Sequence, residues 1–310
     1  MAVDEGAAQQ RGANIELTAD MVVGWGRVPM LNAALPTSLN PGLIASVDDT
    51  KTTSDSYILG FGWWFTNALR LGFRLPIAHA DFSPGASKLS RGATALGNLE
   101  LSVLYERQVS KTFAVIPSLA LALPTAPGNE LPTAASVAVD NRAGHDFGAT
   151  DRYAALRAAA GSRGFEENHL FSSERIGIVP RIDLSFRFGN VEVAPFVKMD
   201  NLFSSTKSAR EGYLANFVLG ASVGVGLMKW LDFGIRAWGS YALEKDGRDD
   251  NVLVNVEPQL RAHVGPIHPV VGVLIPVVPI AAKDSRTTPA GDPIYDPRFV
   301  ALRLAIGAKF

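Results

Sequence analysis

The side chains best suited to chemistry in this chain are few, and their spacing does not assemble a catalytic site. Ser240 falls on the polar side of a predicted strand, but the chain has no Gly-x-Ser-x-Gly turn. His145 lies near Asp146 and Asp151 without the spacing of metal ligands. A hydrolase is therefore only a third hypothesis, and we expect no catalytic residue, no metal and no cofactor. The histidines are His79, His145, His169, His263 and His268.

Composition narrows the class of protein further. The 310 residues include no cysteine, which excludes disulfides, thiol catalysis and thiolate metal sites. The formal net charge of -1 gives no reason to expect a nucleic-acid partner. Hydrophobic residues make up 47% of the chain, yet no run of about 18 apolar residues predicts a transmembrane helix.

The strongest pattern is an alternation of apolar and polar residues that recurs along most of the chain. Successive side chains of a β-strand point to opposite faces, so each alternating segment has one apolar face and one polar face. The segments predicted as strands are 13–25, 55–65, 68–80, 98–108, 112–124, 175–188, 191–200, 212–227, 231–243, 252–264, 267–280 and 298–310.

Short and long connections alternate between these segments, as in a membrane β-barrel with short turns at one end and long loops at the other. We therefore predict an all-β protein, a single closed antiparallel up-and-down transmembrane β-barrel of about 12 strands with short periplasmic turns and long extracellular loops. The barrel is predicted over 13–310, after a periplasmic N-terminal extension at 1–12. The longest extracellular loops are 26–54 and 125–174.

Aromatic residues near the strand ends indicate which face meets lipid. Membrane barrels carry aromatic girdles at both interfaces on their outer face. The rival fold is a soluble sandwich or barrel, in which the apolar face would point inward. The aromatic residues that share the apolar parity of their strands are Trp25, Tyr57, Phe65, Tyr105, Phe113, Phe188, Tyr213, Tyr241 and Phe310.

The opposite parity carries charges of both signs, which a membrane barrel would turn toward a hydrated lumen. Such groups can pair across strands and set the field that a passing solute meets. The candidate lumen and constriction residues are Glu16, Asp20, Arg70, Arg74, Glu100, Arg181, Asp183, Arg187, Glu192, Arg236, Glu257, Arg261 and Arg303.

The two longest loops are candidates for a gate. Within 125–174, the segment Asp151–Ala160 has an N-capping residue and good helix formers, with Tyr153 and Leu156 on one side. It could fold into the barrel mouth as a plug, or remain an exposed helix. In loop 26–54, Met30 and Leu31 are too apolar to be left in water, so they are expected to cover the mouth or contact a hydrophobic ligand.

The final segment, 298–310, alternates to its last residue and ends on Phe310. It resembles the closing strand of a bacterial outer-membrane barrel, whose terminal aromatic is read by the barrel assembly machinery. The resemblance implies an outer-membrane location, with lipid and that machinery as partners. Residues 1–14 lack the basic start and apolar core of a signal peptide, so we expect this sequence to be the mature form.

Residues 96–128 read LGNLELSVLYERQVSKTFAVIPSLALALPTAPG and carry a second resemblance. They resemble the outer-membrane channel family of the phenol meta-cleavage pathway. Leu101 falls one place earlier than the family spacing, and Ala126 and Pro127 precede Gly128 where the family has glycine at once. The resemblance implies a barrel for uptake of small, often aromatic or hydrophobic, compounds. The matching positions are Gly97, Asn98, Leu101, Tyr105, Arg107, Pro117, Leu123, Pro124 and Thr125.

The sequence thus leads to a first hypothesis of an outer-membrane channel or uptake port. Small, possibly hydrophobic or aromatic, solutes would diffuse passively through its charged lumen. The second hypothesis is a non-conducting barrel that acts as a scaffold or binds a ligand or partner. A structure separates them, because a continuous wet path favours transport and a filled interior favours the second.

Overall fold

The strands form one antiparallel sheet that closes on itself. The computed structural model describes residues 14–27, 51–83, 91–127, 148–205, 212–243, 252–279 and 299–310. The strand segments are β1 (Ile15–Arg27), β2 (Lys51–Trp64), β3 (Leu69–Ser83), β4 (Arg91–Leu96), β5 (Leu99–Tyr105), β6 (Arg107–Ser110), β7 (Phe113–Leu123), β8 (Arg175–Phe188), β9 (Val191–Ser204), β10 (Tyr213–Met228), β11 (Leu231–Leu243), β12 (Val252–Ala262), β13 (Ile267–Pro279) and β14 (Val300–Lys309).

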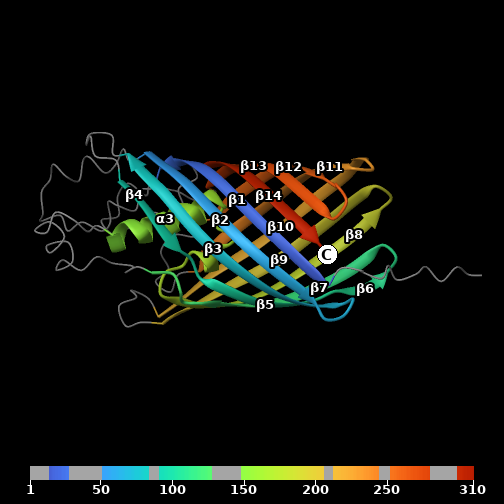
Figure 1. The fold of residues 1–310 in the computed structure, drawn as a ribbon, viewed down its shortest axis with the longest axis horizontal. Coiled ribbons are helices and arrows are strands. Elements are labelled where there is room, and N and C mark those ends of the chain that lie inside the picture. The colour runs from blue at the N-terminus through green and yellow to red at the C-terminus, as the bar shows by residue number, and fades with distance from the viewer. Residues whose placement is uncertain are drawn as a thin grey trace, which may run out of the picture.

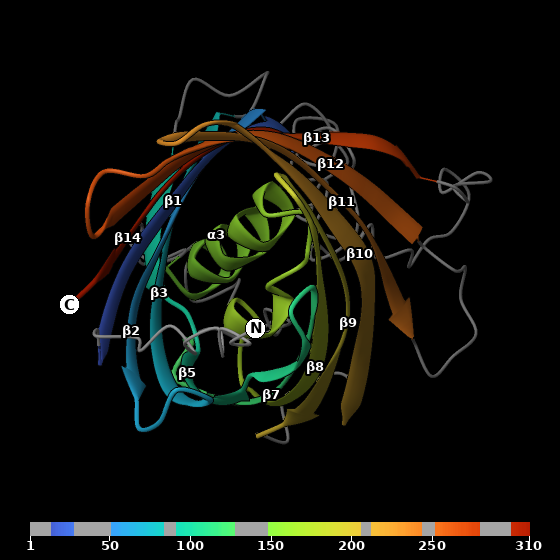
Figure 2. The same ribbon diagram turned by 90° about the vertical axis from the view of Figure 1, so that its right-hand side faces the viewer.

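The first and last strands close the barrel. β1 pairs with β2 on one side and with β14 on the other, from Glu16 opposite Lys309 to Trp25 opposite Val300. Every other barrel strand pairs with its neighbours in the chain, so the topology is up-and-down. Figure 1 shows the tilted strands side by side, and Figure 2 shows the ring that they form when viewed along the barrel.

The segments make a barrel of 12 strands, as the sequence predicts. β4, β5 and β6 follow one another along a single barrel strand, because β3 pairs with both β4 and β5 while β7 pairs with both β5 and β6. The prediction of one unbroken strand over 98–108 is wrong in detail. The pairing begins earlier, at Arg91, and is interrupted at Gly97–Asn98 and at Glu106.

Other boundaries agree with the alternation or extend it. The predictions at 175–188 and 231–243 match β8 and β11 to the residue. β2 begins earlier and β3 ends later than predicted, so both strands extend into segments that the sequence predicted as loops. The short turns are as predicted at Gly189–Asn190 and Gly265–Pro266, where each glycine has a positive φ that other residues rarely adopt. The N-terminal extension 1–12, Met30 and Leu31 lie outside the described residues.

The apolar parity faces outward. Leu59, Leu119 and Leu219 lie in the middle of their strands and expose about half of their surface, as do many other outward aliphatic side chains. Trp25, Phe188 and Phe310 are exposed near strand ends. Such a continuous apolar surface suits hydrocarbon rather than water. The soluble sandwich is therefore excluded. Among the described residues, no helix is long and apolar enough to cross a membrane.

A helix fills part of the interior. α3 (Gly148–Ser162) and the short 3-10 helix η2 (Asn168–Leu170) belong to the connection between β7 and β8. Figure 2 shows α3 inside the ring of strands. The sequence left open whether 125–174 plugs the barrel, and the structure places 148–173 within it. The helix predicted over Asp151–Ala160 is three residues longer at its start and two at its end.

The outward orientation predicts which substitutions the barrel tolerates. Leu219 is 58% exposed near the middle of β10, so Leu219→Arg should destabilise the barrel in phospholipid vesicles by about 2–4 kcal/mol. Gly224→Arg on the same strand is the matched control, because a side chain there meets open space in the lumen. Unfolding by denaturant, followed by tryptophan fluorescence, measures both. Equal losses would contradict the assigned faces.

Candidate functional site: the plug and the lumen

The candidate site is the contact between the lumen wall and residues 148–173, which we call the plug. The plug comprises α3, a turn at 163–167, η2 and the residues that lead into β8. Nearly every side chain described between Ala154 and Ser173 is buried. Because the plug enters from the end of the barrel with the long connections, its turn reaches toward the middle of the lumen.

α3 packs against the wall largely through alanines. Ala154, Ala155 and Ala158 form one buried cluster with Ala80, Phe82 and Phe299 of the wall. Ala159 and Ala160 belong to a second cluster that includes Ala78 and Ala95. These small side chains leave few protrusions to interlock. The predicted gate residue Leu156 is fully buried in the second cluster, whereas the side chain of Tyr153 lies outside the described part of the structure.

The end of α3 approaches β1 very closely. A Cβ atom added at Gly24 would lie 2.5 Å from the Cβ atom of Ser162, so any larger residue there would push the helix away from the wall. Beyond Ser162 the chain turns at Gly164, whose φ of 61° suits glycine. The sequence supplies a glycine at each of these two points.

The carbonyl oxygen of Gly164 is held by three side chains of the wall. It accepts hydrogen bonds from Trp238 Nε1 at 3.1 Å, from Ser240 Oγ at 3.1 Å and from Asn255 Nδ2 at 3.2 Å. These donors lie on the neighbouring strands β11 and β12. Ser240, which the sequence offers as a candidate nucleophile, is therefore a buried hydrogen-bond donor to the plug.

Arg163 reaches a different part of the wall, on β1 and β2. Its Nη1 atom lies 2.9 Å from Asp20 Oδ2 and 2.8 Å from Glu167 Oε2, and its Nε atom donates to Ser56 Oγ at 2.8 Å. Its side chain is only 2% exposed. A buried guanidinium group needs such partners, because an unpaired charge inside a protein is costly.

Two acidic residues of the plug turn, Glu166 and Glu167, bind separate groups of wall cations. Glu166 forms ion pairs with Arg236 and with Arg181, the latter at 3.4 Å. Glu167 Oε1 lies 2.7 Å from Arg74 Nη1. Lys198 Nζ donates to the backbone carbonyl of Glu166. The plug thus inserts negative charge among arginines that would otherwise repel one another.

His169 joins the plug to two wall carboxylates. Its Nε2 atom lies 2.7 Å from Glu100 Oε2, and its Nδ1 atom lies 3.1 Å from Asp200 Oδ1. Arg74 also binds the Glu100 carboxylate, because its Nε atom donates to Glu100 Oε1 at 2.8 Å. The imidazole therefore lies between two acids and is almost completely buried.

Three plug groups, none on a membrane-spanning strand, have shifted pKa values. Burial opposes the charge of Glu166, but Arg236 and Arg181 outweigh it and lower the pKa to about 2. Burial also opposes the charge of Glu167, and Arg163 and Arg74 nevertheless bring its pKa well below the usual range. For His169, burial favours the neutral ring, but the Asp200 and Glu100 carboxylates raise the pKa above its ordinary value.

The Gly-Asn pair of the 96–128 segment anchors the base of the plug. Asn98 Nδ2 donates to the carbonyl oxygens of His169 at 2.9 Å and Ser172 at 2.6 Å, and Asn98 N donates to Leu170 O at 2.6 Å. A Cβ atom added at Gly97 would lie 2.3 Å from Leu170 O. This contact explains the break between β4 and β5.

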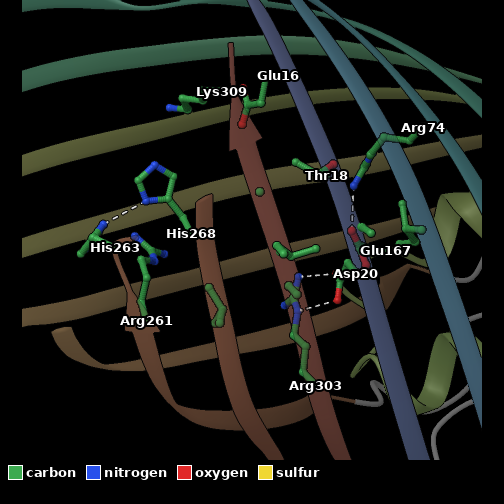
Figure 3. A pocket seen from close by; sticks show the side chains of 16 residues that line it. Glu16, Thr18, Asp20, Arg74, Glu167, Arg261, His263, His268, Arg303 and Lys309 are labelled. Carbon is green, nitrogen blue, oxygen red and sulfur yellow. Dashed lines mark hydrogen bonds and ion pairs between the residues drawn. The ribbon is translucent and has the colours of Figure 1, made fainter. Parts of the chain in front are cut away.

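A charged cavity of about 470 Å³ lies on the short-turn side of the plug. Figure 3 shows Asp20 with Arg303 on one side of it, and Arg261 with His263 and His268 on another. Glu167 and Arg74 of the plug network also line this cavity. A second cavity of about 360 Å³ shares Arg261 and extends toward Arg187 and Glu192.

The structure distributes the predicted lumen residues over three places. The first group contacts the plug directly or through one or two partners and comprises Asp20, Arg74, Glu100, Arg181, Asp183, Arg236, Glu257 and Arg303. Glu16 pairs with Arg70 at 3.1 Å near the short-turn end, and Arg187 lies 3.6 Å from Glu192 at an exposed position. Arg261 lines both cavities.

Sequence reasoning missed the plug's own charged residues, Arg163, Glu166 and Glu167, and the role of His169. Their signal is a dense run of charge, RGFEENH, in the longest connection and shortly before a strand. Within the described residues, no group of three or more histidine or carboxylate side chains is placed to hold a metal ion.

Comparison with known proteins bears on the fold. No protein-family model matches the chain, and no curated protein matches its sequence. An outer-membrane channel from Pseudomonas putida F1 has a similar structure, with a TM-score of 0.59, 12% identity and coverage of 100% of both chains. The transport unit of the autotransporter AIDA-I from Escherichia coli has a TM-score of 0.48 and 8% identity, covering 100% of this chain and 92% of that one.

The fold is that of a bacterial outer-membrane β-barrel. The resemblance inferred from 96–128 and from the closing strand is confirmed at this level. The predicted outer-membrane location is likewise confirmed by the closed barrel, its apolar outer face and the shared fold. The KdgM porin, with a TM-score of 0.43 and 9% identity over 94% of this chain and 99% of that chain, is a more distant likeness.

The Asn98 anchor predicts how the plug can be loosened. Asn98→Ala removes the side-chain bonds to plug carbonyls and should lower the free energy of opening the 163–173 segment by about 1–3 kcal/mol. Hydrogen–deuterium exchange of this segment in detergent measures the change. Asn201→Ala is the matched control, because Asn201 also donates to a carbonyl, that of Ile178, but away from the plug. Unchanged exchange in the Asn98 variant would exclude the anchor.

His169 predicts a pH dependence of stability. Its pKa is higher in the folded protein than in the unfolded chain, so its contribution is complete below the unfolded value of about 6.5 and is lost as pH rises through the folded value. The stability difference between the unmodified protein and His169→Gln should therefore be larger at pH 5.5 than at pH 10. Denaturant unfolding at both pH values tests this. A difference that grows with pH would contradict it.

Proposed function

We propose that this protein is an outer-membrane channel for small solutes that the plug holds closed, and that solutes diffuse passively when the plug moves. The observation that carries the proposal is the charged cavity of about 470 Å³ inside the barrel, beneath the plug. Charged walls keep such a space hydrated, so it can form part of an aqueous path. The fold shared with an outer-membrane channel supports the proposal without establishing it.

The contacts of the plug suit a segment that can leave. The plug turn is attached by hydrogen bonds and ion pairs, each with a net contribution of only about 0.5–3 kcal/mol, and by the burial of Phe165 in the second cluster. When the plug moves, the groups it leaves behind face water in the lumen rather than lipid. The alanines of α3 meet alanines of the wall, so sliding meets little interlocking.

The plug fills the lumen at the end with the long connections, which favours the second hypothesis, a non-conducting barrel. Conductance measurements decide between that hypothesis and the proposed channel. A hydrolase would need a histidine within hydrogen-bond reach of a serine or carboxylate. His169 and His263 both reach carboxylates. However, within the described residues neither is hydrogen-bonded to a serine that could serve as a nucleophile, so we propose no catalysis.

A reversible disulfide lock between the plug and the wall tests whether the plug is the gate. A Cβ atom at Gly177 would lie 3.4 Å from the Cβ atom of His169, close to the separation in a disulfide, and the chain has no cysteine to interfere. We expect planar-bilayer conductance of His169→Cys/Gly177→Cys to be suppressed when oxidised and restored by reductant. Single His169→Cys, measured in both conditions, controls for the loss of the histidine.

The same recordings decide the proposal. Asn98→Ala should open more often than the unmodified protein, because its plug is less firmly anchored. Equal conductance of the oxidised and reduced lock would show that the plug is not the gate. If neither the unmodified protein nor Asn98→Ala conducts or admits solutes into liposomes, the channel proposal is wrong.

A further inference from the structure

In the cavity beneath the plug, the carboxylates have ion-pair partners, whereas two of the cations have none within the described residues. Each of the carboxylates that line it has a cationic partner. Glu16 pairs with Arg70 at 3.1 Å, Asp20 with Arg303 at 2.6 Å and Glu167 with Arg74 at 2.7 Å. Two cations of the same cavity, Arg261 and Lys309, form no ion pair with any residue that the structure describes.

The register shows why these two cations are left over. Lys309 lies directly opposite Glu16 and Arg261 directly opposite Asp232, so each has a carboxylate as its cross-strand neighbour. However, the ion pair of Glu16 goes to Arg70. The Asp232 carboxylate instead lies 2.6 Å from His263 Nε2. Both cations therefore present their charge to the water of the cavity.

A histidine pair lies beside Arg261. His263 Nε2 lies 2.6 Å from Asp232 Oδ2, and His263 Nδ1 lies 3.0 Å from His268 Nδ1. The histidine pair therefore engages the Asp232 carboxylate, and Asp232 does not line this cavity. Figure 3 shows Arg261, His263 and His268 on the same side of the space.

Much of the remaining wall is apolar. Ile58, Val270 and Ala305 line the same cavity on the lumen side of β2, β13 and β14. A cavity of about 470 Å³ is within the range that holds small organic ligands. A solute that fits has a compact apolar body and one anionic group, and a carboxylate matches the planar guanidinium fork of Arg261.

We propose that this cavity is a binding site for small organic carboxylates, with Arg261 and Lys309 as the anion-binding residues. The role of the site in solute passage rests on the proposed channel function, whereas binding itself does not require conduction. Arg261 holds the carboxylate, Lys309 adds a second positive charge, and Val270 and Ala305 contact the apolar body.

Binding is tested on the whole chain in detergent by calorimetric titration with sodium benzoate, with benzamide as the neutral probe of the same shape. We expect benzoate to bind and benzamide to bind at least tenfold more weakly. Arg261→Gln should weaken benzoate at least fivefold, and Lys309→Gln should weaken it less. Arg107→Gln and Lys229→Gln are the matched controls, because both lie at the short-turn end outside this cavity. The heat-dependent gel shift of folded barrels verifies that each variant is folded.

Conductance separates this inference from the channel proposal. In a salt gradient, the conducting protein should favour chloride over potassium, and Arg261→Gln/Lys309→Gln should reduce that preference. Benzoate binding without conductance in any variant supports the site and rejects the channel. Benzoate that binds no better than benzamide, or equally well to Arg261→Gln, overturns the site even if the barrel conducts.

Discussion

The structure depends on one constraint: a sheet in lipid must leave no backbone group unpaired. Hydrocarbon offers no hydrogen bonds, so an open edge would cost several kcal/mol for each unpaired group. β14 meets this constraint by pairing with β1 along nearly its whole length. Closure then fixes the directions in which the side chains of each strand can point. Alternating side chains can point only to lipid or to the lumen, and the apolar parity takes the lipid side.

The same constraint creates the problem that the plug solves. Most charged side chains of the strands point into a narrow interior, where the low dielectric makes unpaired charges expensive. Some of them pair across strands, as Arg303 does with Asp20. Others are left with an excess of one sign, as where Arg181 and Arg236 both lie beside Phe196. Glu166 supplies the missing negative charge, and Arg163 adds a second positive partner to Asp20. The plug therefore completes the electrostatics of the wall.

The features that could be predicted from the sequence are those set by interactions between residues close together in the chain. Strand alternation is a period-2 signal within one segment, so β8 could be predicted to the residue. The helix of the plug was also visible, because capping and propensity are local. Its location was not, since the contacts of Arg163 join residues more than a hundred positions apart, such as Asp20 and Ser56. The break at Gly97–Asn98 was hidden for the same reason: it exists because Leu170 needs room and a donor.

The two halves of the lumen differ in how their charges are satisfied, and that difference bears on function. In the plugged half, each buried ionic group that contacts the plug has a protein partner, so nothing there calls for a solute. In the short-turn half, Arg261 and Lys309 face a hydrated cavity, and the neighbouring carboxylates are engaged elsewhere. A barrel that served only as a scaffold would gain nothing from leaving cations unmatched in a space wide enough for a ligand. A solute path needs such a space, because binding must be favourable enough to admit the solute and weak enough to release it.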